Sequence, residues 1–97
     1  MPRHITKLAF RNRFSMSEKT GIELAALHDP GAPIEQRQAS AGLRVYLADL
    51  NAATYIDLEN EGARAGVLGL EAMGIIDAGR ATQILDAEIL GEERFYA

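Results

Sequence analysis

The sequence predicts an all-α domain, a compact bundle of about four short helices with a basic N-terminal arm. Three observations point to this fold. Apolar residues recur at helical spacing, residues typical of helix starts and stops divide the chain into short segments, and no stretch has the strand pattern that would indicate a sheet. The 97 residues suit one small domain. Its core should be aliphatic, because the chain has no Trp and only three Tyr and three Phe.

The first element lies within residues 4–14, and its sequence permits two structures. Ile5, Leu8 and Ala9 have helical spacing, whereas Leu8 and Phe10 would share one side of a short strand. We expect residues 1–14 to form a short helix or an ordered basic arm.

The next helix is predicted from about residue 16 to 27. Ser15 and Glu18 match a capping box, in which each side chain accepts a hydrogen bond from the backbone N–H of the other residue. One apolar stripe is expected to face the core, widened by Ile22, Ala25 and Ala26; it comprises Met16, Thr20, Leu24 and Leu27.

A turn at residues 28–33 separates this helix from the longest one. Pro30 and Gly31 break the helical pattern, and Pro33 suits the first position of a helix that runs to about Ala52. Its strongest apolar face consists of Leu43, Tyr46, Leu47 and Leu50.

Three glycines mark the helix predicted from about residue 58 to 73, for which Thr54 or Asp57 is a suitable N-cap. Gly62, Gly66 and Gly69 follow one another at helical spacing and together cost about 2–3 kcal/mol relative to alanine. We expect another backbone to approach this smooth flank closely.

The chain then closes with a short helix and an acidic segment. Gly74 fits a left-handed helix stop, and Asp77 is the expected cap of a helix from about residue 78 to 85. Residues 86–97 are expected to form an acidic tail, so the helical domain proper spans residues 15–85. Phe95 and Tyr96 in that tail are either a docking peptide or an anchor on the chain's own surface.

Neither catalysis nor metal binding is indicated by the sequence. The chain has no Cys and only two His, and His28 precedes Asp29 in a Pro-Gly turn that offers no third ligand. We expect no enzymatic activity, no cofactor, no metal and no small-molecule substrate. No apolar run is long enough for a membrane helix, and we expect a cytoplasmic protein.

Charge is divided unevenly along the chain. Residues 1–19 carry five basic residues against Glu18 and have a net charge of +4, whereas residues 20–97 have −8. Arg11 and Arg13 lie among Lys7, Phe10 and Phe14 in a mixture that single-strand binders also use. We expect the aromatic rings to pack on the core, leaving the cations for water, a protein partner or, less favoured, nucleic acid.

Two stretches of the chain resemble small, uncharacterised proteins encoded in tailed phages and prophages of Gram-negative bacteria. They are residues 5–19, ITKLAFRNRFSMSEK, and residues 51–58, NAATYIDL, continued by residues 66–81, GVLGLEAMGIIDAGRA. Residues 28–40 are an insertion relative to that pattern. The resemblance implies a phage structural or accessory gene, a bacterial host cell, and an association with the virion, without an activity.

The sequence therefore predicts a non-enzymatic structural or assembly-accessory protein that acts through protein–protein contacts or self-association. A nucleic-acid-binding or regulatory protein that uses the basic N-terminus, including Arg3, is the alternative. The expected contact residues are Arg11, Arg13, Gly62, Gly66, Gly69, Phe95 and Tyr96.

Overall fold

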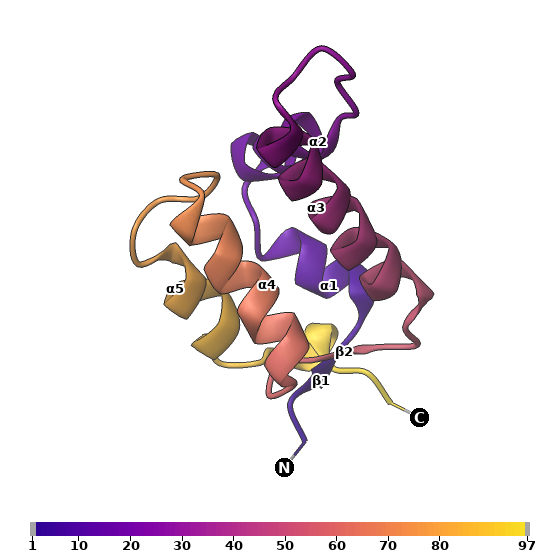
Figure 1. The fold of residues 1–97 in the computed structure, drawn as a ribbon. Coiled ribbons are helices and arrows are strands. Elements are labelled where there is room, and N and C mark those ends of the chain that lie inside the picture. The colour runs from indigo at the N-terminus through magenta and orange to yellow at the C-terminus, as the bar shows by residue number, and fades with distance from the viewer. Residues whose placement is uncertain (1, 97) are drawn as a thin grey trace.

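The structure, a computed structural model, describes residues 2–96. In chain order its elements are β1 (His4–Ile5), α1 (Lys7–Asn12), α2 (Met16–Ala26), α3 (Ile34–Ala52), β2 (Ile56–Asp57), α4 (Glu61–Ala72), α5 (Arg80–Asp86) and the 3-10 helix η1 (Gly91–Glu93). The predicted all-α fold is confirmed, since helices make up most of the described chain. The long helices α3 and α4 flank α1, α2 packs against α3, and α5 packs against α4 (Figure 1).

A small antiparallel sheet, which the sequence did not indicate, joins the N-terminal strand β1 to β2 in the middle of the chain, and an isolated bridge joins β1 to the C-terminal segment. His4 pairs with Asp57 and Ile5 with Ile56, while Ile5 also bridges to Arg94. Strands of two residues are too short to produce an alternating pattern. Both termini therefore lie at one end of the molecule, and the turn at residues 28–33 lies at the other (Figure 1).

Helix starts and stops follow the sequence in part. The capping box of α2 is confirmed, with Glu18 N–H donating to Ser15 Oγ at 3.1 Å and Ser15 N–H donating to Glu18 Oε1 at 2.7 Å. Gly74 has the expected left-handed conformation, with φ of 76°. The N-cap of α4 differs: Asn60, rather than Thr54 or Asp57, accepts from Ala63 N–H at 2.9 Å.

The cap of α5 comes from another helix. Asp77 was the expected cap, but α5 starts after Gly79, whose φ is 87°. The Glu71 carboxylate at the end of α4 accepts hydrogen bonds from the N–H groups of Gly79 at 2.9 Å and Ala81 at 3.1 Å. A carboxylate at a helix N-terminus is favoured by the helix dipole, so this contact also fixes α5 against α4.

One apolar core joins all the segments, including the N-terminal residues. Ile5, Phe10 and Phe14 are buried in it, so residues 4–14 are part of the domain. Leu8 points outward, with 66% of its surface exposed. The other large members of the core are Ile22, Leu43, Ile56, Leu58, Val67, Leu70, Ile76, Ile84 and Leu85.

The predicted core face of α2 is wrong for its main stripe and confirmed for the residues that were expected to widen that stripe. Met16, Leu24 and Leu27 are 73%, 64% and 62% exposed, whereas Ile22 and Ala26 are buried. The buried side of α2 carries Ile22 and Ala26, and a Cβ built at Gly21 would lie 3.6 Å from the Ile75 side chain, so α2 comes close to the turn after α4 there. Close packing on that side thus leaves the larger stripe in solvent.

Candidate functional site

An apolar cavity of about 240 Å³ opens between α1, α2, α3 and α4. Its wall is formed by side chains from all four helices and from β2, namely Phe10, Phe14, Ile22, Tyr46, Leu47, Leu50, Ile56 and Leu70. Phe10 and Phe14 are stacked edge to face, with ring centroids 5.4 Å apart. They lie four residues apart on α1 and beyond its end, so one face of this short helix supplies much of the aromatic wall.

Cationic side chains surround the mouth of this cavity. Lys7, Arg11 and Lys19 line it, against the single carboxylate of Glu23. Lys7 Nζ donates to Asn51 O at 2.7 Å. Within residues 2–96, the side chains of Arg11 and Lys19 form no hydrogen bond or ion pair, and Arg11 is exposed. The cavity therefore combines an apolar interior with a net positive rim, here named the basic-rimmed cavity.

Tyr46 separates this cavity from a second, more open hollow. Its hydroxyl donates to Ala63 O at 2.9 Å, and burial raises the pKa of Tyr46 to about 12. The hollow on its other side, of about 540 Å³, is lined by Asp49, Asp57 and Gly62 among others. The two concave surfaces thus differ in charge on either side of one fixed ring.

The three glycines of α4 do not share one environment. The ring of Tyr46 occupies the space that a Cβ at Gly66 would need, whereas among residues 2–96 a Cβ built at Gly69 would meet no atom within 4 Å apart from its chain neighbours and the backbone of its own helix. At Gly62 the nearest atom is the side-chain oxygen of Asn60, 3.2 Å away. Within the chain, the close approach is therefore that of a tyrosine side chain to Gly66, where we expected a backbone along the whole flank.

Arg13, expected as a contact residue beside Arg11, is occupied within the fold. Only 7% of its side chain is exposed, and its Nε and Nη2 donate to the two carboxylate oxygens of Glu93 at 2.9 and 3.0 Å. Its Nη1 donates to Ile84 O at 2.7 Å. Burial opposes ionisation of Glu93, but hydrogen bonds from Arg13 and from Leu90 N–H outweigh it and lower the pKa of Glu93. Arg13 thus fastens the C-terminal segment to α1.

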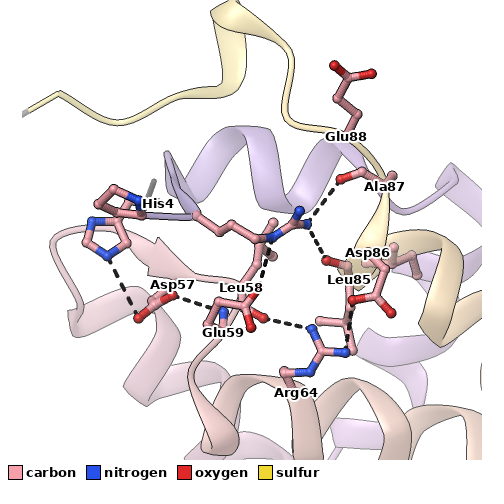
Figure 2. A network of polar contacts seen from close by, with 12 residues as sticks. His4, Asp57, Leu58, Glu59, Arg64, Leu85, Asp86, Ala87 and Glu88 are labelled. Atoms are coloured by element: carbon pink, nitrogen blue, oxygen red, sulfur yellow. Dashed lines mark hydrogen bonds and ion pairs between the residues drawn. The ribbon is translucent and has the colours of Figure 1, made fainter.

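Arg3, named in the nucleic-acid alternative, is also used internally. Its Nη2 donates to Leu85 O at 2.7 Å and to Ala87 O at 3.1 Å, and its Nε lies 3.3 Å from Glu59 Oε1. Figure 2 shows the neighbouring contacts, in which Arg64 reaches both Leu58 and Asp86. The nucleic-acid alternative uses Arg3, Lys7, Arg11 and Arg13, and of these Arg11 alone has a side chain with no hydrogen bond or ion pair within residues 2–96.

Phe95 and Tyr96 have different surroundings. Phe95 N–H donates to His4 O at 3.0 Å, and the Phe95 ring stacks on Tyr55, with centroids 5.1 Å apart. Tyr55 in turn stacks on His4 at 4.1 Å. Tyr96 is 74% exposed. Phe95 is therefore an anchor on the chain's own surface, and Tyr96 is the part of the pair that a partner can reach.

Sequence reasoning found part of the basic-rimmed cavity and missed the rest. The alternation of Lys7, Phe10, Arg11 and Phe14 was visible, and the rings pack inward as expected. Lys19 and Glu23 were missed, because no local pattern shows that this face of α2 meets α1.

Two other features bear on function. Among residues 2–96, no helix combines the length and apolarity that crossing a bilayer requires. The same part of the chain brings no three His, Asp or Glu side chains together where they could hold a metal ion. No protein-family model matches this sequence, and comparisons with curated proteins and with solved structures found no significant match.

Proposed function

We propose that this protein is a non-enzymatic binding protein that receives an apolar side chain of a protein partner in the basic-rimmed cavity. The observation that carries this proposal is the cavity itself, with its apolar wall and the cations Lys7, Arg11 and Lys19 at its mouth. A side chain buried in a desolvated pocket with a charged rim is the usual arrangement of an interface anchor.

The size of the cavity favours a side chain over a small-molecule ligand. At about 240 Å³, it is below the range of about 300–1,000 Å³ for pockets that bind drug-sized molecules and cofactors. One or two leucine- or phenylalanine-sized groups fit such a volume. The positive rim then selects partners whose anchor is flanked by Asp or Glu, because like charges at the rim oppose binding.

The setting that we propose is a phage-type structural or assembly-accessory role in a bacterial host cell, with association to the virion. Its support is the resemblance of residues 5–19, 51–58 and 66–81 to small phage and prophage proteins. Assembly factors act by binding other protein chains, and a cavity of this type can bind an apolar side chain of such a chain.

The test is a pull-down from phage-producing cells with three forms of the protein. The wild type is compared with Arg11→Glu/Lys19→Glu, which reverses the rim charge, and with Arg11→Lys/Lys19→Arg, which keeps it. We expect a phage structural protein, identified by mass spectrometry, to be retained by the wild type and the charge-preserving control and lost from the reversed variant.

Two results would contradict the proposal. One is a set of bound proteins that is the same for all three forms, which would show that the basic-rimmed cavity is not the binding site. The other is nucleic acid retained by the wild type and released by moderate salt, since phosphate binding depends strongly on counterion release.

A further inference from the structure

We infer that the basic-rimmed cavity also accepts the Leu90 loop, residues 88–92, of a second copy of this chain, so that copies associate head to tail. The inference rests on the proposed binding role of the cavity and names a partner for it. Three observations support it. The loop has an exposed apolar side chain between two carboxylates, the cavity has cations of opposite charge at its mouth, and helix α1 lies between the loop and the cavity of one molecule.

The Leu90 loop presents an apolar residue flanked by negative charge. Leu90 is 54% exposed, and Glu88 and Glu92 on either side of it are exposed as well. Figure 2 shows the Glu88 side chain extending away from the polar network beneath it. Within residues 2–96, neither carboxylate is in an ion pair. This pattern is the complement of an apolar cavity rimmed by Arg11 and Lys19.

The backbone of the loop is held in place before any partner binds. Leu90 N–H donates to Glu93 Oε1 at 3.0 Å, and Arg13 donates to Ala87 O at 3.2 Å and Glu88 O at 3.3 Å. The loop therefore loses little conformational freedom on binding, which lowers the cost of association. Ile89, the residue before Leu90, is partly buried and packs against the core, which anchors the loop.

Helix α1 separates the loop from the cavity of the same molecule. Residues 7, 10 and 11 of α1, with Phe14 just beyond it, face the cavity. Thr6 and Arg13 face the C-terminal segment, through Thr6 N–H to Glu93 O at 2.9 Å and the Arg13–Glu93 pair. At about 100° per residue, the Arg13 side chain lies about 120° from Lys7 and about 160° from Arg11 around the helix axis. The Leu90 loop can thus fill the cavity of another copy, but not its own.

Such a contact joins two different surfaces and is heterologous. Each copy then keeps one free cavity and one free loop, and growth ends only if the chain of copies closes into a ring. Opposite charges at the rim make the association weaker at high salt, since the Debye length falls from about 10 Å at 0.1 M to about 3 Å at 1 M.

The test uses purified protein alone, in sedimentation velocity over a range of concentrations. Leu90→Asp removes the apolar knob, and Arg11→Glu/Lys19→Glu removes the complementary rim. Leu90 and Arg11 are exposed and Lys19 is half-buried, and circular dichroism verifies that the variants fold. Leu68→Asp is the matched control, because Leu68 on α4 is 49% exposed and is neither a lining residue of the cavity nor part of the Leu90 loop.

We expect the wild type and Leu68→Asp to form concentration-dependent oligomers. Leu90→Asp and Arg11→Glu/Lys19→Glu, each alone, should self-associate at least about tenfold more weakly than the wild type. Leu90→Asp loses the burial of one leucine, and Arg11→Glu/Lys19→Glu loses the complementary charge at the rim. An equimolar mixture of the two variants should form 1:1 dimers and nothing larger, since the mixture has one intact loop and one intact cavity per pair.

Three outcomes would overturn the inference: a monomeric wild type at all concentrations, oligomers unaffected by Leu90→Asp, or an equal loss with Leu68→Asp. Because no other protein is present, such a failure is separate from a failure of the proposed function. Partner capture in the pull-down can succeed with a strictly monomeric protein.

Discussion

At the scale of single residues, Gly66 is the glycine of α4 on which packing depends. Gly66→Ala would place a methyl group inside the ring of Tyr46, and the repacking should reduce the free energy of unfolding by about 1–3 kcal/mol. Gly69→Ala is the matched control on the same helix, where the space is open. It should increase stability by up to about 1 kcal/mol through helix propensity. Urea unfolding of both variants is the measurement, and an equal effect at the two positions would contradict this account.

Arg13 and Arg11 illustrate how two neighbouring arginines come to have different roles. Arg13 lies with Glu93 in a pair whose side chains are 7% and 14% exposed, so Arg13→Ala leaves a partly buried carboxylate unpaired. We expect a loss of about 3 kcal/mol in the free energy of unfolding. Arg11→Ala, at an exposed position, should change it by less than about 0.5 kcal/mol. Chemical denaturation of the two variants measures both values, and similar losses would show that the Arg13–Glu93 pair has no special weight.

At the scale of elements, the start of α2 is linked to α5 by one ion pair. Arg80 Nε and Nη2 donate to the Glu18 carboxylate at 2.7 and 2.8 Å, and Nη2 also donates to Arg13 O at 2.9 Å. Hydrogen bonding from Arg80 is the main cause that lowers the pKa of Glu18 from 4.5 to about 2, and Ser15 adds to it. Three helices therefore meet at a carboxylate that stays ionised in acid.

This arrangement predicts a specific loss of stability in acid. Because the folded pKa of Glu18 is below its unfolded value, its contribution is complete above pH 4.5 and disappears as the pH falls towards about 2. The contribution is about 1–2 kcal/mol after allowance for solvent screening. Glu18→Gln keeps the capping-box acceptor but should flatten the pH dependence of unfolding in this window. Glu35→Gln, which removes an exposed first-turn carboxylate of α3, is the control and should leave most of the slope.

The elements also show which structural information is local in the sequence. Ser15, Glu18 and Gly74 act through backbone groups a few residues away, so the predicted cap and stop were confirmed. The cap of α5 was not predictable in this way, because Glu71 belongs to the preceding helix and reaches α5 through the fold. The main stripe of α2 was predicted wrongly for a related reason: helical spacing places Leu24 and Ile22 on different sides of the helix, and contacts with distant segments decide that Ile22, not Leu24, is buried.

At the scale of the whole molecule, the acidic C-terminal segment is part of the folded unit. Glu93 O accepts from Thr6 N–H at 2.9 Å, and Phe95 N–H donates to His4 O at 3.0 Å. Removal of residues 91–97 should therefore lower the melting temperature by at least about 10 °C. Removal of residues 96–97 alone should have almost no effect, because Tyr96 is 74% exposed. Thermal melting followed by circular dichroism compares the two, and equal melting temperatures would contradict a structural role for this segment.

The candidate site was predictable only where one helix determines it. The cations and rings of α1 share a face by helical spacing, and the sequence indicated that the rings would pack inward. Lys19 reaches the same cavity from α2, and Arg13 is withdrawn from the surface by Glu93, 80 residues away. Both facts depend on contacts between distant segments of the chain, and the sequence next to Lys19 or Arg13 does not indicate such contacts.

The pairing of the N-terminal residues with both β2 and the C-terminal segment also affects how the protein folds. Arg94 Nη1 donates to Pro2 O at 3.3 Å across 92 residues of sequence. The pairing of β1 with β2 closes a loop that contains α1, α2 and α3. These pairings raise the contact order above that of a simple helical bundle, because each of them requires the closure of a large loop. We therefore expect the chain to fold more slowly than its helix content suggests. A circular permutant that joins the adjacent ends and opens at the exposed turn of residues 28–33 would remove the longest of these closures while keeping every helix intact.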